Sequence, residues 1–221
     1  MNQLEYIQQD TGENPDASVI WLHGLGANGH DFEPVVPELG LPQGASVRFI
    51  FPHAPEMPVT INGGIRMPAW YDIKSLELGR TVDKDQLVAS AQAVAALVEQ
   101  EIERGVKSER IVIAGFSQGG AVAYELGLSC PKPLAGILAL STYFATADSV
   151  QCSEANRNIP ISVHHGTHDP MIPEALGRAS MEKLQAMGYQ ADYRTWPMEH
   201  AVCLEEIHAI GEFLRNVLEL G

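Results

Sequence analysis

Short apolar runs alternate with amphipathic helical patterns along most of the chain. Most of the runs are continuously apolar, which is typical of strands that are buried on both faces of a sheet. The predicted strands are Val19–His23, Val47–Phe51, Ile111–Phe116, Leu134–Leu140, Ile161–His165 and Ala191–Trp196. Strands that alternate with helices in this way predict an α/β fold, with a mostly parallel central sheet flanked by helices.

The helical patterns lie between these runs and after the last one. The clearest helix is predicted to begin at Asp83, whose side chain caps it, and to end at Gly105. Its apolar positions recur at spacings of three and four residues: Leu87, Ala91, Val94, Val98 and Ile102. Further helices are predicted at Ala121–Leu128, Glu174–Met187 and Leu204–Val217. With no repeat or long linker between them, these elements predict a single domain over residues 1–221.

Residues 52–78 break the alternation of strands and helices. This segment is rich in Pro and Gly and carries the large apolar residues Met57, Met67, Trp70 and Tyr71. Long loops inside compact domains are usually functional or mobile. Two interpretations therefore stay open: a surface excursion with a small satellite core, and a lid or rim that faces a substrate.

The sequence Gly115-Phe116-Ser117-Gln118-Gly119 lies between a predicted strand and a predicted helix. A strand, a G-x-S-x-G motif and a helix in this order are typical of a nucleophile elbow, a tight and strained turn that exposes the serine hydroxyl. Glycine is expected two residues either side of the serine because side chains there would collide. The alternative is a turn that merely tolerates Gly and Ser, but the strand and the helix favour Ser117 as a catalytic nucleophile.

A second loop of small residues, His23-Gly24-Leu25-Gly26, follows the first predicted strand. Such a loop can direct a backbone N–H at a substrate carbonyl oxygen. We predict that the N–H groups of Leu25 and Gln118 form an oxyanion hole. A phosphate-binding loop is the alternative, but no Lys-Ser/Thr follows and the glycine spacing differs from that motif. His23 is expected to hold the loop through hydrogen bonds.

The order Ser, acid, His that elbow enzymes follow restricts the remaining catalytic residues. His200 lies in a loop between a predicted strand and the last helix, so we predict that it is the general base. Asp169 follows the preceding strand, where a carboxylate can orient the imidazole. Asp148 and Asp192 are the rival acids.

His164, His165 and His168 lie close to Asp169 and together resemble a metal-binding cluster. Adjacent residues of a strand point to opposite faces, so His164 and His165 cannot easily bind one ion. Structural hydrogen bonding is the expected role of both residues, and no metal is predicted.

The composition limits the binding partners and the cellular location that we expect. With 14 Lys+Arg against 28 Asp+Glu the net charge is −14, which opposes binding to nucleic acid or anionic membranes. No apolar run is long enough to span a bilayer, and the first residues show no secretory signal. The three cysteines form no CxxC or CxxH pair, so a disulfide framework or a zinc site is not expected. A cytoplasmic location is predicted.

Taken together, the motifs resemble the phospholipase/carboxylesterase family, which includes acyl-protein thioesterases and small bacterial carboxylesterases. The segments that carry the resemblance span almost the whole chain: Val19–Gly26, Phe51–Pro55, Trp70–Asp72, Gly115–Gly120, His165–Pro170 and the loop at His200. The resemblance implies an α/β-hydrolase fold without a large cap domain. Ser117, Asp169 and His200 fall on the family's triad positions, and Leu25 and Gln118 fall on its oxyanion positions.

The expected activity is that of a serine carboxylesterase, which hydrolyses short-to-medium acyl esters through an acyl-enzyme and needs no cofactor. The alternatives are an acyl-protein thioesterase or lysophospholipase and, outside enzymes, an inactive binding protein on the same fold. The expected partner is a small or lipid-like acyl ester, and a homodimer stays open. Hydrophobic residues that either line the acyl pocket or fill the core are Leu25, Ile61, Met67, Trp70, Met171 and Met198.

Overall fold

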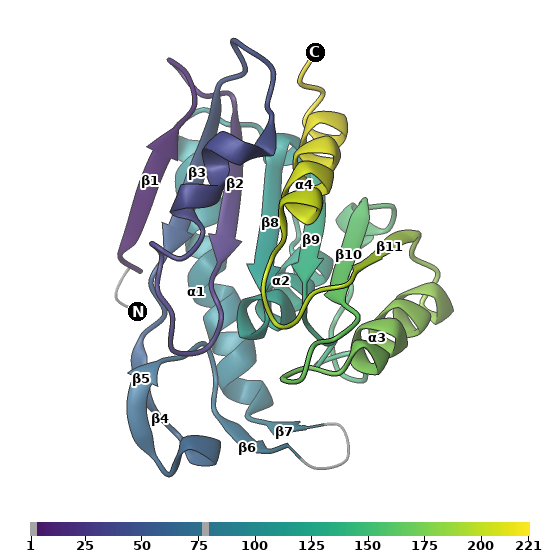
Figure 1. Cartoon of the computed structure of the whole chain (residues 1–221). Helices are drawn as coiled ribbons and strands as arrows, with labels where there is room; N and C mark the ends of the chain where they lie inside the picture. The colour runs from purple at the N-terminus through teal and green to yellow at the C-terminus, as the bar shows by residue number, and fades with distance from the viewer. Residues whose placement is uncertain (1–3, 77–79) are drawn as a thin grey trace.

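The fold is described by a computed structural model, which covers residues 4–76 and 80–221 (Figure 1). Its centre is a seven-stranded sheet with the order β1-β3-β2-β8-β9-β10-β11. These strands are β1 (Tyr6–Asp10), β2 (Ala17–Leu22), β3 (Val47–Pro52), β8 (Ile111–Phe116), β9 (Gly136–Leu140), β10 (Ile161–Gly166) and β11 (Ala191–Trp196). Only β1 at the edge runs antiparallel to its neighbour. The predicted parallel sheet is confirmed, and its six strands agree with the apolar runs to within about two residues at each end.

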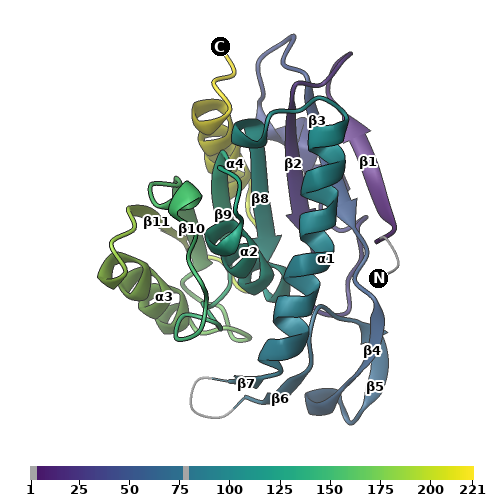
Figure 2. The ribbon, with the colours of Figure 1, turned by 180° about the vertical axis from the view of Figure 1, so that it is seen from behind.

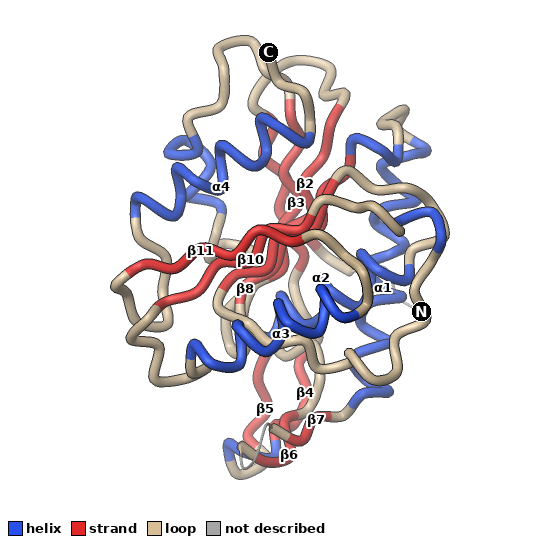
Figure 3. Tube along the Cα trace, turned by 90° about the vertical axis from the view of Figure 1, so that its right-hand side faces the viewer, coloured by secondary structure: helices blue, strands red, loops and turns tan. Residues whose placement is uncertain are grey.

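Helices cover both faces of this sheet. Helices α1 (Lys84–Glu103), α2 (Gln118–Ser129) and α3 (Glu174–Ala186) lie on one face, and α4 (Leu204–Val217) lies on the other (Figures 2 and 3). A short 3-10 helix, Glu33–Leu39, packs beside α4. No helix in the described part of the chain is long and apolar enough to cross a membrane.

Strand β2 shows why the apolar runs are continuous. Ile20 and Leu22 join the core under α1 and α2, whereas Val19 and Trp21 join the core under α4. All four side chains are at most 1% exposed. A strand covered on both faces needs apolar residues at every position, so alternation is lost.

The predicted start of α1 is also confirmed. The Asp83 side chain accepts a hydrogen bond from the Gln86 backbone N–H at 3.1 Å, which satisfies one of the free donors of the first helical turn. The sequence expected Gly105 to end the helix, and the last helical residue is Glu103.

The segment 52–78 contains regular structure that the sequence pattern did not predict. Strands β4 (Glu56–Val59) and β5 (Ile65–Pro68) form one hairpin, and β6 (Ile73–Ser75) pairs with β7 (Thr81–Val82). Both hairpins lie beyond the carboxyl ends of the parallel strands (Figure 1). Between them, Trp70 and Tyr71 are fully buried in the main core. The segment is therefore anchored to the core, and residues 77 and 78 lie outside the described residues.

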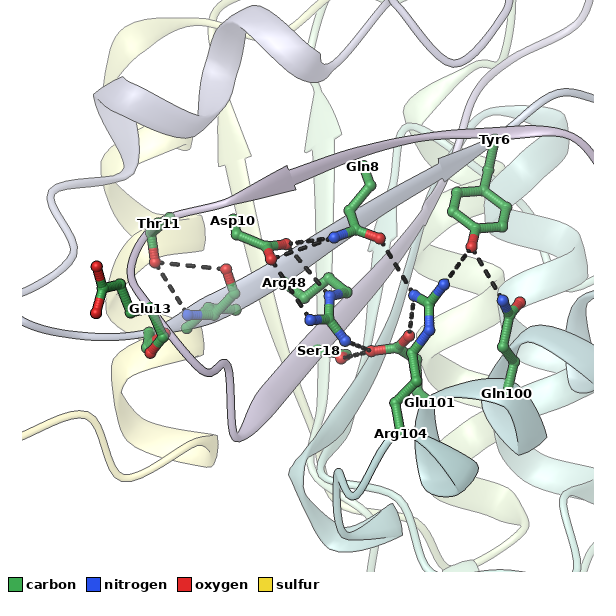
Figure 4. A network of polar contacts seen from close by, with 12 residues as sticks. Tyr6, Gln8, Asp10, Thr11, Glu13, Ser18, Arg48, Gln100, Glu101 and Arg104 are labelled. Atoms are coloured by element: carbon green, nitrogen blue, oxygen red, sulfur yellow. Dashed lines mark hydrogen bonds and ion pairs between the residues drawn. The ribbon is translucent and has the colours of Figure 1, made fainter.

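A buried polar network fastens the edge of the sheet to α1 (Figure 4). The Glu101 carboxylate is fully buried and accepts hydrogen bonds from Arg104 at 2.9 Å and from Arg48 at 3.3 Å. The Ser18 hydroxyl donates to the same carboxylate. Arg104 also donates to the Tyr6 hydroxyl on β1 at 2.8 Å, so one carboxylate on α1 ties together β1, β2 and β3.

Glu101→Gln should therefore destabilise the fold. The neutral amide replaces a charged acceptor between two guanidinium groups, and losing such bonds costs about 2–3 kcal/mol. Urea unfolding followed by circular dichroism measures the loss. Glu103→Gln, on an exposed position of the same helix, is the control and should leave the free energy of unfolding within about 0.5 kcal/mol of the wild-type value. Equal stability of the two variants would contradict the role of the network.

Candidate active site

Ser117 lies at the turn between β8 and α2 with φ 55° and ψ −118°. A positive φ is disfavoured for any residue with a side chain, so this backbone is strained. The flanking glycines make the turn possible. A Cβ at Gly115 would lie 2.3 Å from the carbonyl oxygen of Gly119, and a Cβ at Gly119 would lie 2.5 Å from that of Leu22. Any residue with a side chain at either position would clash with these carbonyl oxygens and displace the backbone of the turn.

The structure brings Ser117, His200 and Asp169 together in one hydrogen-bonded chain. The Nε2 atom of His200 lies 3.0 Å from the Ser117 Oγ, and its Nδ1 lies 2.6 Å from the Asp169 Oδ2. A carboxylate accepts from Nδ1–H, so Nε2 is left to accept the serine proton. The rival acids point elsewhere: Asp148 lies 3.8 Å from Lys183, and Asp192 pairs with Arg194 at 2.6 Å.

The Asp169 carboxyl is held in its charged form. Burial acts to raise its pKa, but the hydrogen bond from His200 and those from the backbone N–H groups of Ile172 and Met171 outweigh burial and lower the pKa. Both backbone bonds reach the Asp169 Oδ1 at 2.8 Å. They fix the carboxylate in place and leave Oδ2 directed at the imidazole.

Close packing also positions the loop that carries His200. A Cβ at Gly166, the last residue of β10, would lie 2.4 Å from the carbonyl oxygen of Met198 and 2.5 Å from that of Glu199. The Phe116 ring lies against the imidazole of His200, with ring centroids 4.7 Å apart. The loop therefore rests directly on the end of β10, the strand that leads to Asp169.

Leu25 and Gln118 lie beside Ser117 and line the same cavity. Within residues 4–76 and 80–221, neither backbone N–H has a hydrogen-bond acceptor. The side chain of Gln118 is engaged elsewhere, because it accepts from the Trp70 N–H at 2.8 Å and donates to the Tyr71 carbonyl oxygen at 2.6 Å. The Trp70 indole N–H donates to the His23 carbonyl oxygen at 2.9 Å. Trp70 therefore connects the loop of Leu25 to the start of α2.

His23 holds the loop, as the sequence predicts. Its Nε2 accepts a hydrogen bond from the Ala54 N–H at 3.0 Å, and its Nδ1 lies 2.7 Å from the Gly24 carbonyl oxygen. One ring nitrogen accepts and the other donates, which requires the neutral imidazole. Burial is the main cause that lowers the pKa of His23 to about 4, against the opposing effect of the bond to Gly24.

The cavity beside Ser117 has a volume of about 380 Å³ and a largely apolar wall. Of the predicted acyl-pocket residues, Leu25, Ile61, Met67 and Met171 line it. Trp70 and Met198 do not. Trp70 is fully buried behind the loop of Leu25, and the Met198 carbonyl oxygen accepts from the His168 N–H at 3.1 Å at the end of the sheet.

Several lining residues were missed at the sequence level: Asp31, Ile73, Leu76, Arg80, Tyr143 and Ile172. Tyr143 and Ile172 follow β9 and β10 closely in sequence, so the rule that sites gather at the carboxyl ends of parallel strands could have found them. Nothing in the local pattern distinguishes Arg80, which reaches the cavity from the second hairpin.

His164 and His165 point to opposite faces of the sheet, as expected for adjacent residues of a strand. The His164 Nε2 lies 3.0 Å from the Ser162 Oγ, and its Nδ1 lies 3.5 Å from a Glu206 carboxylate oxygen on α4. The His165 Nε2 lies 2.8 Å from the Ile172 carbonyl oxygen, and burial lowers the pKa of His165. His168 is exposed. The residues that the structure describes contain no cluster suited to a metal ion.

The sheet order, the strained serine turn and the hydrogen-bonded chain at its carboxyl edge define an α/β hydrolase of the serine type. The sequence pattern described as Phospholipase/Carboxylesterase matches residues 4–218. The chain belongs to this family and is a serine hydrolase of carboxylic esters.

Comparison with individual proteins agrees with this assignment. Acyl-protein thioesterase 1 of Gibberella zeae is 40% identical over 213 residues, which cover 91% of this chain and 91% of that protein. The protein of the same name from Neurospora crassa is 41% identical, over 91% of this chain and 87% of its own length. The crystal structure of Zea mays acyl-protein thioesterase 2 superposes with a TM-score of 0.85 at 25% identity, and the match covers 97% of this chain and 99% of that one.

The buried, neutral His23 should make folding stability depend on pH. Its pKa is about 4 in the folded protein and 6.5 in the unfolded chain, so the unfolded chain binds the proton first as the pH falls. The stabilisation is full above pH 6.5 and decreases by about 3 kcal/mol as the pH approaches 4. Urea unfolding at several pH values measures this loss. The His23→Gln variant should have a lower free energy of unfolding at pH 7, and this free energy should depend less on pH below that value.

His30→Gln is the matched control, because His30 has a side chain that is 69% exposed. This variant should keep the wild-type pH dependence. A slope that is unchanged in His23→Gln would show that His23 is not the buried neutral group.

Proposed function

We propose that this hydrolase cleaves acyl thioesters on protein substrates, with Ser117 as the nucleophile. Hydrogen bonds run from Asp169 through His200 to Ser117, and Ser117 lines an apolar cavity. This arrangement supports the proposal. The curated relatives at 40–41% identity are acyl-protein thioesterases, so they favour the thioesterase alternative over the short-to-medium-chain carboxylesterase that the sequence suggested first.

In the proposed reaction, the His200 Nε2 accepts the Ser117 proton while Oγ attacks the acyl carbonyl carbon. Collapse of the tetrahedral intermediate breaks the C–S bond, and His200 returns the proton to the leaving thiolate. Water then attacks the acyl-enzyme with His200 as the base, and the fatty acid leaves. Asp169 stays ionised throughout and stabilises the imidazolium that forms in each half-reaction.

The proposed oxyanion hole consists of the backbone N–H groups of Leu25 and Gln118. Both line the cavity beside Ser117, and neither has an acceptor within the described residues. The Gln118 N–H also lies in the first turn of α2, where the helix dipole favours negative charge. A preorganised donor of this kind contributes about 10²–10³-fold in rate.

The mouth of the cavity fits an acyl group that is attached to a large molecule. Met171 is 60% exposed and Leu76 is 56% exposed, and both line the cavity. The cavity therefore opens at the protein surface, so the acyl chain can enter it while the rest of the protein that carries the acylated cysteine stays outside.

A pair of fluorogenic peptides that differ only in an S-acyl or O-acyl linkage tests this function. We expect the thioester to have a kcat/KM at least tenfold above that of the oxygen ester, measured relative to their rates with hydroxide. Ser117→Ala should lower kcat by about 10⁵–10⁶-fold. A preference for the oxygen ester would instead support a carboxylesterase, and preference for a lysophospholipid would support a lysophospholipase.

Ser149→Ala is the control variant, because Ser149 lies exposed in the loop after β9. It should retain wild-type turnover. Turnover by Ser117→Ala at the level of this control would refute the assignment of the nucleophile.

A further inference from the structure

The cavity beside Ser117 ends at a wall that it shares with a second cavity. The second cavity has a volume of about 490 Å³ and lies between α3, the start of α1 and the hairpin of β6 and β7. Among the described residues, only Arg80 and Tyr143 line both cavities. Their side chains therefore form the partition between the two spaces.

This partition is held in place from both sides. The Arg80 guanidinium donates a hydrogen bond to the Met171 carbonyl oxygen, and its central carbon lies 5.3 Å from the centroid of the Tyr143 ring. The Tyr143 hydroxyl in turn lies 3.0 Å from the hydroxyl of the fully buried Tyr71. A stacked guanidinium with a hydrogen bond to the backbone is an ordered wall.

The backbone of Arg80 is also strained. Its φ is 64°, in the left-handed region that residues with side chains rarely adopt. Such a conformation persists only where the surroundings fix it, and it gathers at functional sites. Here the strained backbone directs the long side chain of Arg80 from the second hairpin to Met171.

The two cavities differ in polarity. The cavity beside Ser117 has apolar walls from Met67, Ile73 and Ile172. The buried Phe144 forms part of the wall of the second cavity. Exposed charged residues also line this cavity: Lys74, Lys84, Asp85, Asp148 and Lys183. Burial of apolar surface therefore favours an alkyl chain in the cavity beside Ser117 over the second cavity.

We propose that Arg80 sets the upper limit of acyl-chain length by closing the cavity beside Ser117 against the second cavity. The inference rests on the proposed hydrolysis at Ser117, since only a chain attached there ends at this wall. Chains that fit in front of Arg80 are processed efficiently, and longer chains must displace the guanidinium from Met171 and Tyr143.

A series of acyl thioesters of one thiol, with acyl chains from two to sixteen carbons, tests the limit. For the wild-type protein, kcat/KM should rise by up to about fourfold per methylene and then fall sharply at one chain length. Arg80→Gly removes the side chain and suits the positive φ. In this variant, we expect the sharp fall in kcat/KM to occur at a chain at least two carbons longer. The kcat/KM for the shortest chain that the wild type processes poorly should rise at least tenfold.

Arg80→Asn is the second variant, because asparagine tolerates the left-handed region and also shortens the side chain. Lys183→Ala is the control, since Lys183 lines only the second cavity. In this control, kcat/KM should fall at the same chain length as in the wild type. If kcat/KM also falls at the wild-type chain length in both Arg80 variants, with turnover intact, the proposal for Arg80 is overturned and the proposed hydrolysis stands.

Two further results separate the possibilities. If no chain length is turned over above the level of Ser117→Ala, the proposed function itself fails. If the wild type instead prefers chains that end in a carboxylate over methyl-ended chains of equal length, and Arg80→Gly loses that preference, Arg80 recognises an anion and the length limit is overturned.

Discussion

The conformation of Ser117 is the constraint on which the site depends. Strand β8 ends and α2 begins within one residue, so the serine must adopt a positive φ to join them. Two hydrogen bonds offset the strain: the Ser117 N–H donates to the Leu140 carbonyl oxygen at 2.8 Å, and the Thr142 hydroxyl donates to the Ser117 carbonyl oxygen at 2.6 Å. The end of the neighbouring strand β9 and Thr142 after it therefore hold the turn. They fix the Ser117 backbone in its strained conformation, with the hydroxyl beyond the edge of the sheet.

The rest of the site follows from the order of the strands around that turn. Leu25 lies just beyond β2, and Asp169 and His200 lie beyond β10 and β11. Because these strands are parallel, their carboxyl ends lie at one edge, and short loops are enough to bring the side chains together. The hairpins of the segment 52–78 complete the arrangement from outside the sheet. Trp70 joins the loop of Leu25 to the helix behind Ser117, so this segment is part of the scaffold as well as part of the cavity wall.

The sequence predicts most of the fold and the three residues of the candidate triad because both depend on local patterns. Continuous apolar runs identify buried strands, and G-x-S-x-G between a strand and a helix identifies the turn. The edge strand β1 was missed because its half-buried sequence Tyr-Ile-Gln-Gln-Asp carries no clear period, and its place depends on pairing with the distant β3. Trp70 illustrates the limit at the site. Its size and apolar character suit a pocket and a core equally well, and only the tertiary contacts with His23 and Gln118 decide between them. Arg80 reaches the cavity through a backbone conformation that no local pattern indicates.

The proposed mechanism requires Ser117, activated by His200, to form a covalent acyl-enzyme. Rapid mixing of the protein with an acyl thioester, followed by acid quenching and mass spectrometry of the intact chain and its peptides, detects this intermediate directly. We expect a transient mass increase of one acyl group, located on the peptide that contains Ser117 and absent from Ser117→Ala. An acyl group on another residue, or turnover by Ser117→Ala at the wild-type rate, would contradict it.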